Sequence, residues 1–94
     1  MNDDNAIDWS RVDWKKLNDF NVVISNRIKK RMPADYSLSF DEIKSEVNAA
    51  FVQLIKAFNP MTNGLSLTSW CYQYAEKIAF GKIMREYKRL KKQI

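Results

Sequence analysis

Three stretches of the chain place apolar residues at the three- and four-residue spacing of an α-helix that faces a core. The first ends in a run of cations followed by Pro33, which favours a helix end there. Its start is open, because several residues can accept a hydrogen bond from a first helical turn. The candidate caps are Asp8, Ser10 and Asp13, and the apolar positions are Leu17, Phe20, Ile24 and Ile28. We predict a helix over residues 13–32, preceded by a leader over 1–12.

The second stretch has the best-marked start. Ser39 and Glu42 form a capping-box pattern, in which each side chain bonds the backbone N–H of the other residue. Asn59 and Pro60 end the stretch, since a residue before proline avoids the helical conformation. We predict a helix over 39–58, with a polar face opposite its apolar one. The apolar positions are Ile43, Val47, Ala50, Phe51, Leu54 and Phe58.

The third stretch follows a turn signal at Asn63-Gly64. Thr68 is the predicted N-cap, with Leu67 before it in the position of a hydrophobic staple. We predict a helix over 68–92. Its predicted inward positions are Cys71, Tyr74, Ala75, Ile78, Ile83, Tyr87 and Leu90.

The composition agrees with one helical bundle. A chain of 94 residues is long enough for one core. With 46% hydrophobic and 29% charged residues it lies in the range of folded proteins. Its 2 glycines and 2 prolines are too few for the turns of a many-stranded sheet. We therefore predict an all-α fold, a compact bundle of three principal helices in a single domain over residues 1–94.

Charge and location follow from the same counts. The chain has 16 Lys and Arg against 11 Asp and Glu, a net charge of +5, which permits nucleic acid or an anionic surface as a partner. The N-terminus is polar, and no apolar run approaches the roughly 18 residues of a membrane span. The single cysteine, Cys71, cannot form an internal disulfide. We expect a cytoplasmic protein that does not enter a membrane.

The residues that most enzymes need are missing. The sequence has no histidine, which removes the usual general base and the commonest metal ligand. Glu42 and Glu46 lie four apart on one helix, with no second carboxylate pair to face them. Cys71 is either a buried structural thiol, the interpretation we favour, or a thiol with a lowered pKa near a helix start. We predict no enzymatic activity, no cofactor and no metal site.

The positive signal lies in the last predicted helix. Seven cations fall within 77–92, against the single acid Glu86. An aromatic cluster, Trp70, Tyr72 and Tyr74, comes directly before them. Stacking rings beside a basic track are a means of holding single-stranded nucleic acid. Two other interpretations stay open, namely a solvated helix end for the cations and a ring cluster wrapped around the first helix.

Several segments together resemble region 2 of the sigma-70 family of bacterial transcription initiation factors. They are FDEIKSEVNAAF at 40–51, AFNP at 57–60, Gly64, and LTSWCYQYA at 67–75. Their order and spacing match the family's acidic helix, its turn and its aromatic helix start, with one extra residue in the turn. The resemblance covers about residues 17–90 and implies the fold of that region.

The resemblance also implies a protein partner. In the family the acidic helix docks on the clamp helices of the β′ subunit of bacterial RNA polymerase core. Carried over by position, the polymerase-binding residues are Glu42, Ser45, Glu46, Asn48 and Gln53.

Promoter DNA is the second implied partner. The family's next helix recognises or melts the minus-ten element, with an aromatic ring trapping a base of the single-stranded non-template strand. The residues expected to bind DNA by position and by the basic run are Trp70, Tyr72, Gln73, Tyr74, Lys77, Lys82, Arg85, Lys88 and Arg89. The sequence departs from the family where Gln73 and Tyr74 replace paired tryptophans, Val47 replaces a glycine and Glu76 replaces an arginine.

No helix-turn-helix for the upstream promoter element follows in this sequence, so we expect further transcription proteins to supply that recognition. This arrangement resembles the reduced sigma-like proteins of bacteriophages, which would place the protein in the host bacterial cytoplasm. The alternative is a polymerase-binding adaptor or inhibitor that does not open DNA. A third possibility is a DNA-binding bundle unrelated to polymerase.

Overall fold

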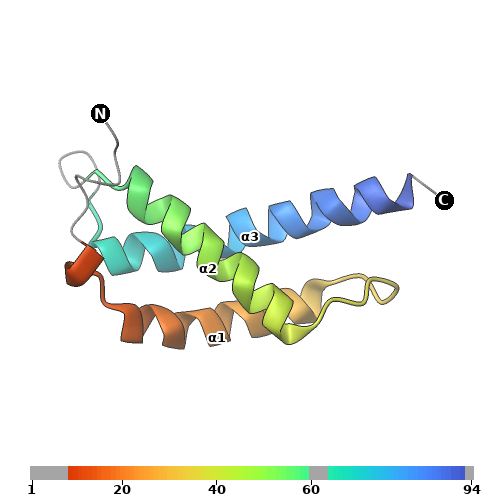
Figure 1. Ribbon diagram of the computed structural model, residues 1–94, viewed down its shortest axis with the longest axis horizontal. Coiled ribbons are helices and arrows are strands. Elements are labelled where there is room, and N and C mark those ends of the chain that lie inside the picture. The colour runs from red at the N-terminus through yellow and green to blue at the C-terminus, as the bar shows by residue number, and fades with distance from the viewer. Residues whose placement is uncertain (1–8, 60–63, 93–94) are drawn as a thin grey trace.

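The computed structural model describes residues 9–59 and 64–92, and in these ranges every regular element is a helix. A 3₁₀ turn, η2, spans Trp9–Arg11. The bundle helices are α1 at Trp14–Arg31, α2 at Phe40–Ala57 and α3 at Leu67–Lys91. Each of them packs against the other two (Figure 1). The predicted all-α bundle is thereby confirmed. None of the described helices is long and apolar enough to cross a membrane.

Local hydrogen bonds explain where α1 and α2 begin. Asp13 caps α1 by accepting a hydrogen bond from the Lys16 N–H at 3.1 Å. The capping box of α2 is present, with the Glu42 N–H donating to Ser39 Oγ at 3.1 Å and the Ser39 N–H donating to Glu42 Oε1 at 3.4 Å. Met32, which precedes proline, ends α1 in an extended conformation. Both helices therefore follow the predicted boundaries closely.

The start of α3 differs from the prediction. Ser66, and not Thr68, is the N-cap, and its Oγ accepts a hydrogen bond from the Ser69 N–H at 3.2 Å. Leu67 is the first helical residue, so it does not take the staple position before the cap. The earlier start lets Leu67 pack against the core from within the helix. Asn63 of the predicted turn lies outside the described residues.

Part of the predicted leader belongs to the fold. Val12 is a core residue with 7% of its surface exposed. The ring of Trp9, in η2, stacks on that of Trp14 in α1, with centroids 6.3 Å apart. Apolar burial thus fixes residues 9–12, whereas 1–8 lie outside the described residues.

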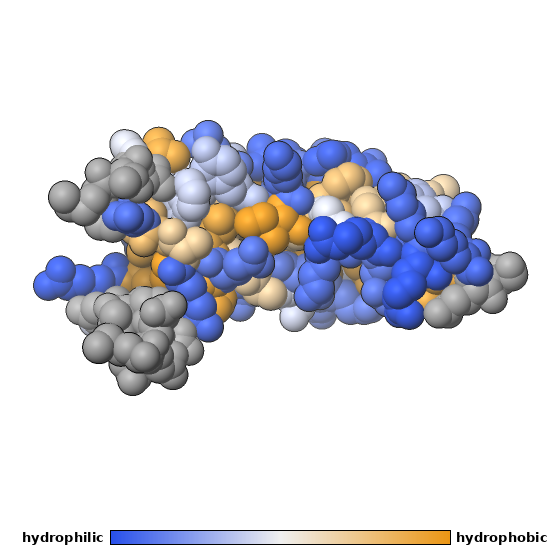
Figure 2. Space-filling model, turned by 90° about the horizontal axis from the view of Figure 1, so that it is seen from above, coloured by the Kyte–Doolittle hydropathy of each residue, from blue (hydrophilic) through white to orange (hydrophobic). Residues whose placement is uncertain are grey.

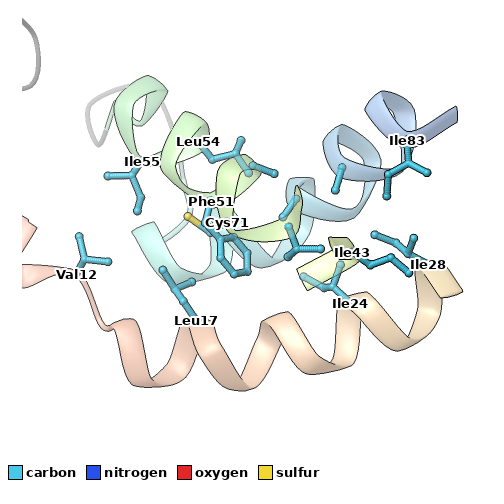
Figure 3. Packing of buried hydrophobic residues seen from close by; sticks show 14 residues of the cluster. Val12, Leu17, Ile24, Ile28, Ile43, Phe51, Leu54, Ile55, Cys71 and Ile83 are labelled. Carbon is cyan, nitrogen blue, oxygen red and sulfur yellow. The ribbon is translucent and has the colours of Figure 1, made fainter. Parts of the chain in front are cut away.

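The core lies between the three helices (Figure 3). Its residues come from Val12 and from all three helices: Leu17, Ile24, Ile28, Ile43, Val47, Ala50, Phe51, Leu54, Ile55, Cys71, Ala75, Ala79 and Ile83. A buried polar link joins α1 to α2, since Asn21 Nδ2 donates to the Lys44 carbonyl at 3.0 Å and accepts from Ser25 Oγ at 2.8 Å through its own oxygen. Buried polar groups that are paired in this way fix the register of two helices.

The inward face of α3 was predicted only in part. Tyr74 and Leu90 are 36% and 41% exposed, so their predicted burial is wrong, while Ala79 is 1% exposed. The small side chains of Cys71, Ala75 and Ala79 let α3 lie close to its neighbours. Leu90 is exposed because α3, with 25 residues, is longer than α2, with 18 residues. The C-terminal part of α3 therefore projects past α2 (Figure 1).

Candidate nucleic-acid interface

The connection between α1 and α2 holds the projecting part of α3 in place. Tyr87 Oη donates a hydrogen bond to Asp35 Oδ1 at 2.8 Å, and the Tyr36 and Tyr87 rings lie 5.2 Å apart. Lys91 Nζ stands 3.4 Å from Asp35 Oδ2. The hydrogen bond from Tyr87, followed by Lys91, lowers the pKa of Asp35 below its usual value. A charged carboxylate is therefore available at neutral pH to hold the basic end of α3.

Some of the cations of α3 are neutralised within the protein. Lys82 Nζ lies 3.2 Å from Glu46 Oε2 on α2. Arg89 forms a bidentate ion pair with Glu86, one turn earlier on the same helix. Together with Lys91 these residues have carboxylate partners, so they offer less charge to an outside anion than the sequence suggests. Lys82 and Arg89 were both predicted DNA-binding residues.

The other cations of α3 share one face. Lys77, Arg85, Lys88 and Lys92 have no carboxylate within ion-pair distance among the described residues. Their spacing keeps them on one side of the helix, and they span roughly 22 Å at about 1.5 Å per residue. We call these four residues the basic face. Figure 2 shows hydrophilic side chains gathered toward the end of the molecule where α3 ends.

Tyr74 lies on the same side of α3, one turn before Lys77. Its ring packs at 4.6 Å against the Trp70 ring, at an interplanar angle of 59°. Gln73 Nε2 lies 3.5 Å from the Tyr74 hydroxyl. Tyr74 is thus an exposed ring, packed against Trp70, at one end of the basic face. It is the aromatic of the predicted cluster that can stack on a base without a change in the fold.

Trp70 has a structural contact that the sequence does not reveal. Its indole N–H donates to the Leu54 carbonyl at 2.9 Å. Leu54 lies in the last turn of α2, where backbone carbonyls have no partner within the helix. The Trp70 ring also lies 6.4 Å from that of Phe58, the C-cap of α2. Trp70 therefore joins the start of α3 to the end of α2.

Tyr72 faces α1. Its ring lies 4.4 Å from the Phe20 ring, and the Arg27 guanidinium lies over it at 5.4 Å. This is the arrangement expected if the aromatic cluster wraps around the first helix, and for Tyr72 that interpretation holds. The three aromatic residues thus divide among α1, α2 and the surface.

The predicted polymerase-binding residues all lie on α2, but they do not form one patch. Glu42, Ser45 and Glu46 line a cavity of about 380 Å³ between α2, α3 and the preceding connection. The other lining residues are Tyr36, Leu38, Lys82, Ile83 and Glu86. Asn48 lines a second hollow on the side of α1, which adjoins the cavity at Ser45, and Gln53 is exposed.

Glu46 was predicted to bind polymerase and Lys82 to bind DNA, but the two side chains form an ion pair with each other. Glu46 Oε2 is buried and makes no hydrogen bond in the described part of the chain. The Lys82 ammonium at 3.2 Å is the charge that compensates it. Because 60% of the Lys82 side chain is exposed, the pair contributes at most about 1 kcal/mol. It links the cavity to α3.

Two arginines of α1, which were not predicted as site residues, lie beside α3. Arg27 Nε and Arg31 Nη1 bind the two carboxylate oxygens of Glu76 at 2.9 and 2.8 Å. The Arg31 guanidinium also lies 4.0 Å from the centre of the Phe80 ring. The four-residue spacing of the arginines was visible in the sequence, but it was interpreted only as a cationic helix end. They lie beside Lys77 because α1 packs along α3.

Cys71 is a buried thiol, and burial raises its pKa to about 11. It is therefore protonated at neutral pH, as expected for a structural cysteine and not for a nucleophile. Among the described residues, no group of three or more acidic or cysteine side chains could hold a metal ion.

No protein-family model matches this chain, and no characterised protein or solved structure is significantly similar to it.

Proposed function

We propose that this protein is a sigma-like transcription initiation factor. It binds RNA polymerase core, at the β′ clamp helices, through acidic residues of α2, and it holds the single-stranded non-template strand of the minus-ten element along α3. The observation that carries the proposal is the basic face. Its cations have no carboxylate partner among residues 9–59 and 64–92, they are aligned along α3, and the exposed ring of Tyr74 adjoins them.

The charge distribution of α3 suits a phosphate backbone. Lys82 and Lys91 pair with acids outside α3, and Arg89 pairs with Glu86 on α3 itself. The cations of the basic face have no carboxylate partner among the described residues and are exposed. If each cation of the basic face neutralises one phosphate, affinity for a single strand falls roughly fiftyfold between 50 and 200 mM salt. A salt-independent affinity would contradict this part of the proposal.

Tyr74 is the residue we propose for base stacking. Stacking on an aromatic ring contributes about 1–3 kcal/mol per base, enough to offset much of the cost of unstacking a base from a duplex. Trp70 supports the Tyr74 ring from behind and fixes it relative to α2. In this proposal Trp70 positions the site and Tyr74 makes the contact.

The cavity beside α2 is the proposed polymerase contact. It is lined by three carboxylates and one ammonium, with apolar walls, so it suits a basic side chain with an aliphatic stem. Glu42 is exposed and forms no ion pair with a cation of the described residues, which makes it the acid most accessible to a partner.

The first experiment measures whether the purified protein co-elutes with bacterial RNA polymerase core and competes with the resident sigma factor. Glu42→Gln removes the charge and keeps a residue type that completes a capping box. Asp41→Asn is the matched control, because Asp41 is the neighbouring exposed acid and lines the hollow on the α1 side. We expect the Glu42 variant to compete less well than the control. Equal competition by both variants would contradict the docking assignment.

One observation favours the alternative, a polymerase-binding adaptor or inhibitor that does not open DNA. Trp70 and Tyr72 are half-buried and contact α2 and α1, which leaves Tyr74 as the exposed ring of the cluster. Tyr74→Ala separates the two functions, with Tyr74→Phe as the control that keeps the ring. Lost open-complex formation with retained polymerase binding supports the sigma-like factor. A wild-type protein that binds polymerase but yields no open complex supports the adaptor.

A further inference from the structure

A shallow hollow lies where the end of α1 meets the middle of α3. It is lined by Arg31, Gln73, Glu76, Lys77, Phe80 and Gly81. It opens beside the basic face, because Lys77 and Gly81 are spaced one turn apart and the next cations of that face follow at Arg85 and Lys88. A strand that follows the basic face away from Tyr74 therefore passes over this hollow.

Gly81 has no structural reason to be glycine. It lies in the interior of α3, where glycine weakens a helix relative to alanine. A Cβ added at Gly81 would meet no atom within 4 Å, and the described glycines have no positive φ. What the missing side chain does provide is open backbone at the floor of the hollow, on which another chain can lie closely.

Arg31 is held in a fixed orientation at the wall of the hollow. Its guanidinium lies 4.0 Å from the centre of the Phe80 ring, and its Nη1 donates to Glu76 Oε2 at 2.8 Å. About half of the side chain is exposed, and a guanidinium has five N–H donors, so donors remain for an anion. A stacked and hydrogen-bonded arginine loses little freedom when it binds a phosphate.

The hollow is positive although Glu76 lies in it. Arg27 and Arg31 share this one carboxylate, and its two oxygens are both engaged. The group of three therefore has a net positive charge. Lys77 adds a second positive charge and has no carboxylate partner in the described chain.

We propose that this hollow binds a backbone phosphate of a single nucleic-acid strand, held between Arg31 of α1 and Lys77 of α3, with the strand lying over Gly81. The inference rests on the proposed function, because the ligand is the strand that the basic face holds. The nucleic-acid interface then includes α1 as well as α3, with Arg31 binding the phosphate and Gly81 making room for the strand.

The first test compares Arg31→Gln with Lys29→Gln. Both residues lie in the last turn of α1, both substitutions remove one positive charge, and Lys29 lies outside the hollow. The assay is fluorescence anisotropy of a labelled 20-nucleotide oligo-dT at several NaCl concentrations. We expect Arg31→Gln to weaken binding about fivefold or more and to reduce the salt slope by roughly 0.7, the value of one phosphate on a single strand. Lys29→Gln should stay within twofold of the wild type.

The second test is Gly81→Ala, which separates a structural role from a binding role. The added methyl meets no protein atom, so helix propensity should raise the Tm by about 4 °C or more. The same methyl occupies the floor of the hollow, so affinity for oligo-dT should fall at least threefold. A more stable variant with unchanged affinity would overturn the part assigned to Gly81.

The outcomes separate this inference from the proposed function. If Lys88→Gln weakens oligo-dT binding while Arg31→Gln and Lys29→Gln give equal affinities, the hollow is not a phosphate site and the basic face stands. If the wild type binds no oligo-dT, the hollow and the basic face both fail, and competition for polymerase core still tests the docking surface.

Discussion

Trp70→Phe tests most directly whether Trp70 has a structural role while Tyr74 makes the stacking contact. The substitution keeps a ring and removes the indole N–H that donates to the Leu54 carbonyl at 2.9 Å. The net value of a hydrogen bond is about 1 kcal/mol, and leaving a buried carbonyl without a partner raises the cost to about 1–2 kcal/mol. For a chain of this length that corresponds to a Tm lower by roughly 5–15 °C.

Thermal unfolding followed by circular dichroism measures this loss, with Tyr74→Phe as the control. The Tyr74 hydroxyl has only a 3.5 Å contact with Gln73 at the surface, so its removal should leave the Tm nearly unchanged. Affinity for oligo-dT is then measured at a temperature at which all variants are folded. We expect Tyr74→Ala to weaken binding more than Trp70→Phe does. The Tyr74→Ala variant loses about 1–3 kcal/mol of stacking, whereas Trp70→Phe retains most of its affinity. A Trp70→Phe variant as stable as the wild type but unable to bind would refute the assignment.

Three further predictions concern charges and the thiol. A double-mutant cycle with Glu46→Gln and Lys82→Met, measured by urea unfolding, should give a coupling energy of at most about 1 kcal/mol. A larger coupling energy would mean that water screens the ion pair less than the exposure of Lys82 indicates. Cys71, whose pKa burial raises to about 11, should resist a thiol reagent at pH 8 until the protein unfolds. Burial of the neutral thiol stabilises the fold below the ordinary pKa of 9.0, and this stability is lost as pH rises toward about 11. Asp35, whose pKa the Tyr87 hydroxyl lowers, contributes stability above its ordinary pKa of 3.8 that is lost in acid. Asp35→Asn should therefore reduce the loss of Tm between pH 5 and about pH 3, and an unchanged acid dependence would contradict the hydrogen bond.

The periodicity was sufficient for the helices because helix formation is a local property. Neighbouring members of the apolar faces of α1 and α2, and the two residues of the capping box at Ser39, lie at most four positions apart, and most of them occur in the structure as predicted. Phe58 was predicted to face the core from within the second helix, but it is the C-cap of α2 and is only half-buried. The start of α3 was harder, since Ser66 and Thr68 are both good caps and tertiary packing of Leu67 decides between them. Leu90 fits the helical stripe as well as Ile83 does, but no neighbouring helix reaches it.

The sequence alone determined the helices, the overall positive charge and the acidic and basic character of α2 and α3, because these depend on composition and short-range spacing. Only the tertiary structure decided which charges and rings remain available. Lys82 and Arg31 are paired with acids 36 and 45 positions away along the chain, and Trp70 bonds a carbonyl at the end of another helix. Such contacts arise from how the helices pack, so a helical pattern cannot distinguish a cation that is neutralised from one that faces solvent.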